Sequence, residues 1–216
     1  MACAGIGLIR LVDDDVVELG NLNRQLLFGE NDLGRVKVDA AAGALSAHDS
    51  GLGVERVRRR VCSEADVAEV IDGADVLLAT ADWPPYELPR WVNSACLAQG
   101  VPYITAGQFP PLVRIGPTVI PGVTACHECQ EVAIRREYPL YDQLAEFRYQ
   151  RPTSASTYGA ASGLIGTLIA NEALHLLTGL CKPATAGRAI TANLCTLEVQ
   201  RERVESVPGC KACGAT

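Results

Sequence analysis

The chain has 216 residues, of which 48% are hydrophobic and 20% charged, and its formal net charge is −6 at pH 7. This length supports one substantial hydrophobic core, so we expect a single domain over residues 1–216. Lysine and arginine are dispersed apart from a short arginine-rich run at 56–60, which excludes a basic face for nucleic acid or anionic lipid and leaves small molecules and proteins as partners.

The nine cysteines are an odd number, and the N-terminus lacks the pattern of a signal peptide. Both features favour a reducing cytoplasm over a disulfide framework. The apolar stretch 159–180 is long enough to cross a membrane, but Asn171, Glu172 and His175 lie near its middle. We therefore expect a buried helix and no membrane partner.

The first element in the chain is an apolar run, 5–12, typical of a buried strand in a parallel sheet. It runs directly into Asp13, Asp14 and Asp15. In doubly wound nucleotide-binding folds, an acidic residue at the carboxyl end of such a strand accepts hydrogen bonds from ribose hydroxyls. Asp13 is the candidate for this role. The alternative is that all three aspartates are a solvated strand end.

The next periodic segment predicts a helix that begins at Asn31 or Asp32 and carries apolar residues at helical spacing through Leu45. Lys37 would then lie in its first two turns. A cation there opposes the helix dipole, so a role outside helix stability, such as phosphate binding, would explain it. The alternative is an exposed surface lysine.

Further along, residues 54–61 predict a strand, 65–71 a helix and 74–79 a buried strand. This alternation indicates a parallel sheet with right-handed crossovers, whose ligand crevice lies at the carboxyl ends of the strands. Asp82 follows the third strand, so we expect it at the same edge as Asp13. The turn at 83–85 then starts a helix through Trp91, Asn93 and Ala95, and a strand at 101–105 completes this part.

Two Cys-x-x-Cys pairs stand far apart in the chain, Cys126 with Cys129 and Cys210 with Cys213. Four thiolates in two such pairs are the usual ligands of tetrahedral zinc. Since they leave no open coordination position, the zinc would be structural and would join the C-terminus to the middle of the chain. The alternative is a redox or free-thiol role. His127 is expected to be a bystander.

The order of these motifs resembles one known family over nearly the whole chain. VDDDVVELGNLNRQ, GRVK, ATAD, NSAC, LIANEALHLLTG and the two Cys-x-x-Cys pairs are similar to the ThiF/MoeB family of ubiquitin-activating-enzyme-like adenylyltransferases. The block ADWPPYELPRWVN and the run IGPTVIPGVTACHECQ resemble its MccB-type, peptide-adenylating branch. Relatives that form a thioester carry a cysteine within the segment matching 131–164, and this chain has none there.

The resemblance implies a Rossmann-like α/β fold with a doubly wound, mostly parallel sheet, a C-terminal antiparallel extension and a structural zinc site. Asp13 would bind the ribose of ATP. Arg24 and Lys37 would bind its phosphates, and Asp82 would bind Mg²⁺. Fixed cations and Mg²⁺ neutralise the phosphates as a carboxylate approaches, so we expect these last three residues to be catalytic. The same pocket would be lined by Asp15, Asn21 and Gln25.

The expected function is ATP-dependent adenylation of the C-terminal carboxylate of a peptide, in natural-product or antibiotic biosynthesis, without a thioester step. The resemblance also implies a cytoplasmic homodimer. One alternative is a non-catalytic, zinc-stapled scaffold that binds a peptide or partner enzyme. A weaker alternative is activation of a ubiquitin-like sulfur-carrier protein. Compared with the family, the chain begins after the usual first strand and glycine-rich loop, so we expect a fragment, a half completed by another chain, or a degenerate member.

Overall fold

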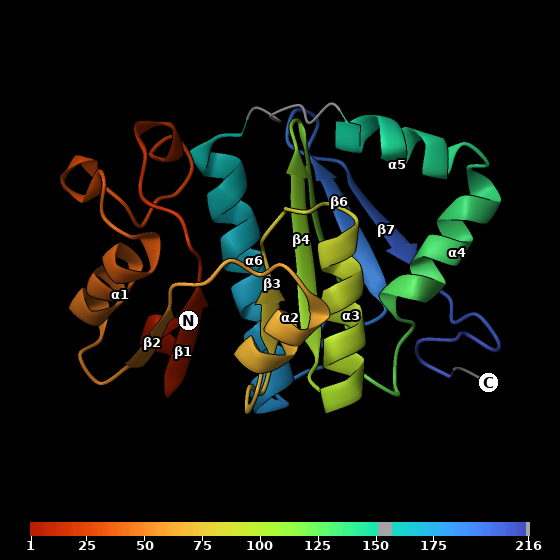
Figure 1. The fold of residues 1–216 in the computed structure, drawn as a ribbon, viewed down its shortest axis with the longest axis horizontal. Helices are drawn as coiled ribbons and strands as arrows, with labels where there is room; N and C mark the ends of the chain where they lie inside the picture. Colours follow the sequence, from red (N-terminus) through yellow and green to blue (C-terminus); the bar gives the residue numbers. More distant parts are fainter. Residues whose placement is uncertain (151–156, 215–216) are drawn as a thin grey trace.

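The structure is a computed structural model that describes residues 1–150 and 157–214 (Figure 1). Its helices are α1 (Lys37–His48), α2 (Glu64–Val70), α3 (Glu87–Gln99), α4 (His127–Glu137), α5 (Tyr141–Gln150) and α6 (Gly159–Thr178). Its strands are β1 (Leu8–Val12), β2 (Gly53–Val57), β3 (Leu77–Ala79), β4 (Tyr103–Phe109), β5 (Leu112–Val119), β6 (Arg188–Asn193) and β7 (Val199–Arg203). Short 3-10 helices lie at Ala2–Ala4, Leu19–Asn21 and Glu30–Asp32. The α/β class is confirmed.

The strands form two sheets within the described ranges. β1 and β2 pair in parallel, and a second sheet has the order β3-β4-β5-β6-β7. Only β3 and β4 are parallel in the second sheet, while each later pair is antiparallel. The expected antiparallel extension is therefore present, but the prediction of a mostly parallel sheet is wrong, and the sheet is mixed. Only two residues separate β4 from β5, a connection that permits a hairpin and no parallel crossover.

The start of α1 also differs from the prediction. The helix begins at Lys37 with Val36 as its N-cap, and residues Glu30–Asp32 form a separate 3-10 turn. Between the two, Gly34 adopts a left-handed conformation with φ of 81°. Such a residue interrupts helical geometry, so the apolar spacing before it does not continue as helix. Lys37 is thus the first helical residue.

Neighbouring side chains on β4 point to opposite faces of the sheet, and helices cover both faces, so apolar residues are buried on each side. Tyr103 packs in a core cluster with residues of α2 and α3, whereas Ile104 packs in a second cluster with α6. The first cluster also contains Cys126, Cys129 and Cys210. Figure 1 shows α2 and α3 in front of the sheet and α6 behind it.

Helix α6 has the length and hydropathy of a membrane span, but one of its faces packs on β4 and β5. Ala161, Ile165 and Ile169 are buried on that face. Leu164 and Leu168 remain exposed on the other. The prediction of a buried helix therefore holds for one face only.

Candidate functional site

Two aspartates and a lysine meet just beyond the carboxyl end of β1. The Nζ atom of Lys37 lies 2.7 Å from Oδ2 of Asp15 and 3.9 Å from Oδ2 of Asp13. Only 10% of the lysine side chain is exposed, against 40% for Asp13 and 65% for Asp15. A nearly buried cation is thus held against two carboxylates that both face solvent.

The backbone between these residues brings them together. The segment after β1 turns back so that Val16 and Val36 form an antiparallel bridge. The backbone N–H of Lys37 donates to the carbonyl of Asp15 over 2.9 Å, and the N–H of Asp13 donates to the carbonyl of Val57 over 3.2 Å. Main-chain hydrogen bonds therefore hold Lys37 against Asp15, and Asp13 against the end of β2.

The polar turn that carries Asn21, Arg24 and Gln25 closes on itself. The Oδ1 atom of buried Asn21 accepts from the N–H of Glu18 over 2.9 Å, so this side chain caps the turn. Arg24 donates from Nη1 to the carbonyl of Gly20 over 2.7 Å. The Oε1 atom of Gln25 is buried without a hydrogen-bond partner. Such an orphaned acceptor is uncommon and indicates a missing donor.

Asp82 follows β3 and is exposed. Across residues 1–150 and 157–214, neither Asp82 nor Arg24 makes an ion pair with the Asp13, Asp15 and Lys37 group. The structure therefore brings together three of the predicted nucleotide-binding residues, and the roles of all of them stay predictions.

The four cysteines predicted as metal ligands form one cluster at the other end of the molecule. Their sulfur atoms all lie within 4.8 Å of one another. Sγ of Cys126 is 3.9 Å from that of Cys129 and 3.7 Å from that of Cys210, and the Cys129 to Cys213 distance is 3.7 Å. A tetrahedral zinc with Zn–S bonds of about 2.3 Å separates its sulfurs by about 3.8 Å. The donor set and spacing fit this ion.

The surroundings of the cluster are closed and partly polar. Cys126 and Cys129 have no exposed surface, and burial raises the pKa of Cys126. Burial also opposes ionisation of Cys210, but the N–H groups of Cys213 and Ala212 donate to its sulfur and lower its pKa to about 7. Hydrogen bonds of this kind stabilise a thiolate, the form that binds metal.

Beside the cluster lies an ionic network that sequence reasoning missed. Glu131 is 2% exposed, and its carboxylate pairs with Arg90 of α3 at 3.1 Å and with Arg135 at 3.4 Å. The Nε2 atom of His127 lies 3.7 Å from Oε1 of Glu131, so this ring faces the carboxylate and lies outside the cysteine cluster. His127 and Arg135 each lie four residues from Glu131, a spacing that could have predicted these two contacts on one helix. The contact with Arg90 had no such signal, because Arg90 is distant in sequence.

Comparisons with known proteins agree on one family. The ThiF family model matches residues 1–212. The chain is 30% identical over 223 residues to the SAMP-activating enzyme E1 of Haloferax volcanii, which covers 99% of this chain and 74% of that protein. It is 29% identical over 216 residues to the sulfur carrier protein ThiS adenylyltransferase of Escherichia coli strain K12, which covers all of this chain and 80% of that protein.

Among solved structures, the chain is similar to E. coli MccB in complex with MccA-N7isoASN. The TM-score is 0.86 with 28% identity, over 99% of this chain and 62% of the MccB chain. MccB with ATP gives a TM-score of 0.84, also at 28% identity, over 99% of this chain and 61% of that chain. The chain therefore spans about three-fifths of the length of MccB.

Proposed function

The chain belongs to the ThiF family, and from this premise we propose that it is an ATP-dependent adenylyltransferase that activates the C-terminal carboxylate of a peptide as an acyl-adenylate. The observation that carries the proposal is the ionic group of Lys37 with Asp13 and Asp15 beyond the carboxyl end of β1. Ligands of open α/β sheets bind at this edge. Named adenylyltransferases among the relatives support the reaction class.

In the proposed reaction, a carboxylate oxygen attacks the α-phosphorus of ATP and pyrophosphate leaves. Both reactants are anions, so fixed positive charge must reduce their repulsion. Lys37 is held in place by two aspartates and by its own backbone, and it supplies this charge without reorganisation. Arg24 adds a second cation if its guanidinium turns from the carbonyl of Gly20 toward the phosphates. No general base is required because the substrate carboxylate is already ionised at neutral pH.

The residues present fit ATP and Mg²⁺. Asp13 keeps carboxylate oxygens exposed beyond its contact with Lys37, as an acceptor for ribose hydroxyls requires. Buried Oε1 of Gln25 lacks the donor that a nucleotide amino or hydroxyl group would provide. Exposed Asp82 would supply the oxygen ligand that Mg²⁺ prefers, and the metal would neutralise phosphate charge. We assign Asp15 and Asn21 to the wall of the same pocket.

We assign zinc to the cluster of Cys126, Cys129, Cys210 and Cys213. Its sulfur spacing and burial fit a four-thiolate structural site, with no position left for a substrate. The metal would join the start of α4 to the C-terminal segment and take no part in the adenylation.

The choice of a peptide substrate rests on two observations. The similarity to MccB, whose structures carry MccA-derived ligands, favours a peptide. In addition, residues 131–164 contain no cysteine for a thioester. The similarity to a ThiS adenylyltransferase supports a second candidate, the activation of a small sulfur-carrier protein. We favour the peptide, in the setting of natural-product or antibiotic biosynthesis, and we infer a cytoplasmic homodimer from the family.

The test is substrate-dependent adenylation with radiolabelled ATP and Mg²⁺. A set of synthetic peptides with free C-terminal carboxylates is compared with the same peptides ending in an amide, and with a purified ThiS-type sulfur carrier. We expect an adenylate only with a free peptide carboxylate. A product only with the carrier protein supports the second candidate. ATP binding without any adenylate, or no ATP binding at all, contradicts the enzyme and leaves a scaffold.

A further inference from the structure

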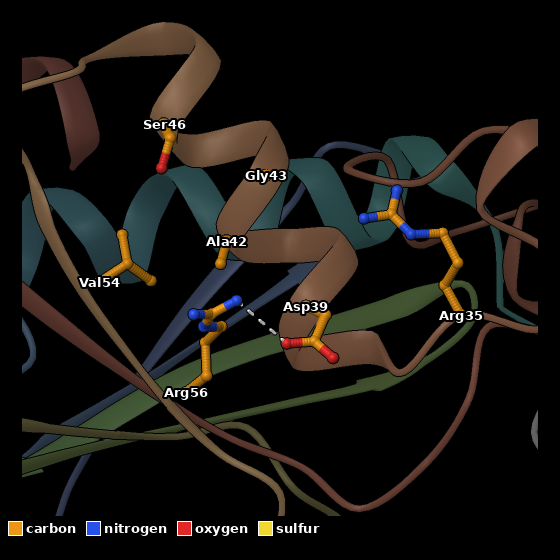
Figure 2. A pocket seen from close by; sticks show the side chains of 7 residues that line it. All are labelled: Arg35, Asp39, Ala42, Gly43, Ser46, Val54 and Arg56. Carbon is orange, nitrogen blue, oxygen red and sulfur yellow. Dashed lines mark hydrogen bonds and ion pairs between the residues drawn. The ribbon is translucent and has the colours of Figure 1, made fainter.

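An open pocket of about 380 Å³ lies between α1 and β2. Figure 2 shows Arg35 and Arg56 on opposite sides of the helical turn that carries Asp39 and Gly43. Ser46 lines the same pocket one turn further along. None of these residues belongs to the proposed nucleotide or zinc sites. The proposed function therefore assigns no role to this pocket.

Both arginines have hydrogen-bonding capacity to spare. Arg35 contacts Asp32 through Nη1 at 2.5 Å, and Arg56 contacts Asp39 through Nη1 at 3.4 Å. A guanidinium has five N–H donors, and the two side chains are 51% and 57% exposed. Most of their donors therefore face solvent beside the pocket, where an anion can reach them.

On the α1 side, the pocket is lined in part by a glycine, which has no side chain. Gly43 is exposed on α1, and a Cβ added there would meet only Nη2 of Arg35, at 3.9 Å. Glycine in the middle of a helix costs about 1 kcal/mol relative to alanine. The missing side chain leaves room for a ligand group between the two arginines.

Positive charge continues from the pocket along the connection between β2 and α2. Arg58 and Arg60 are exposed and make no ion pair within the part of the chain that the structure describes, whereas Arg59 pairs with Glu69. Figure 1 shows this connection running from β2 toward α2. We call Arg35, Arg56, Arg58 and Arg60 the cationic track. It contrasts with a net charge of −6 for the whole chain.

We propose that the pocket and the cationic track bind an extended acidic segment of a polypeptide partner. Carboxylate side chains match the forked donors of arginine, and Arg35 and Arg56 each contact a carboxylate through Nη1 alone, which leaves their other donors for further carboxylates. Three exposed arginines at alternate positions of one segment, with Arg35 nearby, fit a chain with several acidic side chains better than a single small anion. Beside the array, β2 is an edge strand that pairs only with β1 among the described strands, so an extended segment has backbone groups to meet.

The test measures binding of fluorescein-labelled hexaglutamate to the full 216-residue chain by fluorescence anisotropy, without ATP. We expect saturable binding at low salt that weakens toward about 0.15 M salt, as contacts between exposed charges do. Arg56→Gln should weaken binding about tenfold, and Gly43→Glu, which places a carboxylate in the pocket, by at least as much. Because no adenylate is measured, the result is independent of the proposed enzyme activity.

Matched controls make the test specific. Gly43→Ala adds a methyl group without charge, and Arg136→Gln removes an exposed arginine from α4; both should bind within about twofold of the parent. Circular dichroism checks that each variant is folded. Absence of saturable binding, an equal loss in Arg136→Gln, or displacement of the peptide by an equal concentration of inorganic phosphate would overturn the proposal.

Discussion

The cysteine cluster and the Lys37 group are both polar, but they are built in opposite ways. At the cluster and beside it, Cys126, Cys129 and Glu131 are at most 2% exposed, and each of these three side chains has several partners. At the Lys37 group, the cation is buried while Asp13 and Asp15 face solvent. A closed site holds the fold together, whereas an open one keeps acceptors available for a ligand. Variants in the two regions should therefore respond in opposite ways.

The largest expected loss of stability comes from Cys210→Ser. Removing one of four thiolates should release the metal and lower the free energy of unfolding by about 4 kcal/mol or more, because binding energy at a structural zinc is folding energy. Zinc analysis and urea denaturation measure both effects. Cys195→Ser, at an exposed cysteine, is the control and should change neither. Full stability and zinc content in Cys210→Ser would contradict the structural role.

Glu131→Gln should be the next most destabilising change. It removes the buried carboxylate that accepts charge-assisted hydrogen bonds from Arg90 and Arg135, and losing a hydrogen bond to a charged group costs about 2 kcal/mol. Urea denaturation measures the loss, with the exposed Glu137→Gln at the end of the same helix as the control. If Glu131→Gln lowers the free energy of unfolding no more than the control does, the ionic network contributes little to stability. Only the cysteine cluster would then support the contrast between the two regions.

Lys37→Met should reverse the pattern. Its partners are exposed carboxylates that water can solvate, so the free energy of unfolding should fall by only about 1 kcal/mol. Adenylate formation should fall about 100-fold or more because a fixed cation at the phosphates is lost. Lys182→Met, at an exposed lysine after α6, is the matched control. Retained activity in Lys37→Met would remove the assignment of the nucleotide site.

Asp82→Ala should change stability least, within about 0.5 kcal/mol, since the side chain is exposed. It should nevertheless abolish adenylate formation and leave the zinc content unchanged. Asp75→Ala, at an exposed aspartate before the same strand, should keep full activity. ATP binding should be measured for both variants with and without Mg²⁺. Loss of a metal ligand should weaken ATP binding only when Mg²⁺ is present. Unchanged activity in Asp82→Ala would contradict its role.

Sequence reasoning succeeded where the signal is local or carried by residue type. The two Cys-x-x-Cys pairs predicted that four cysteines far apart in the chain come together, and their sulfur atoms do meet. The order of strands and helices predicted the α/β class. Periodicity alone placed the start of α1 too early, since it does not register the left-handed Gly34 that separates the 3-10 turn from the helix. It also missed the bond between Glu131 and Arg90, which are 41 residues apart.

The sequence by itself determined which chemical groups this protein has and in what order they occur: thiolate pairs, an acidic strand end, and a lysine after a polar turn. Only the tertiary structure decided which of them meet. It joined Lys37 to Asp15 through a bridge between Val16 and Val36, and it made the later strands antiparallel. The physical reason is that such contacts depend on chain reversals and on burial, which arise only when distant segments pack together.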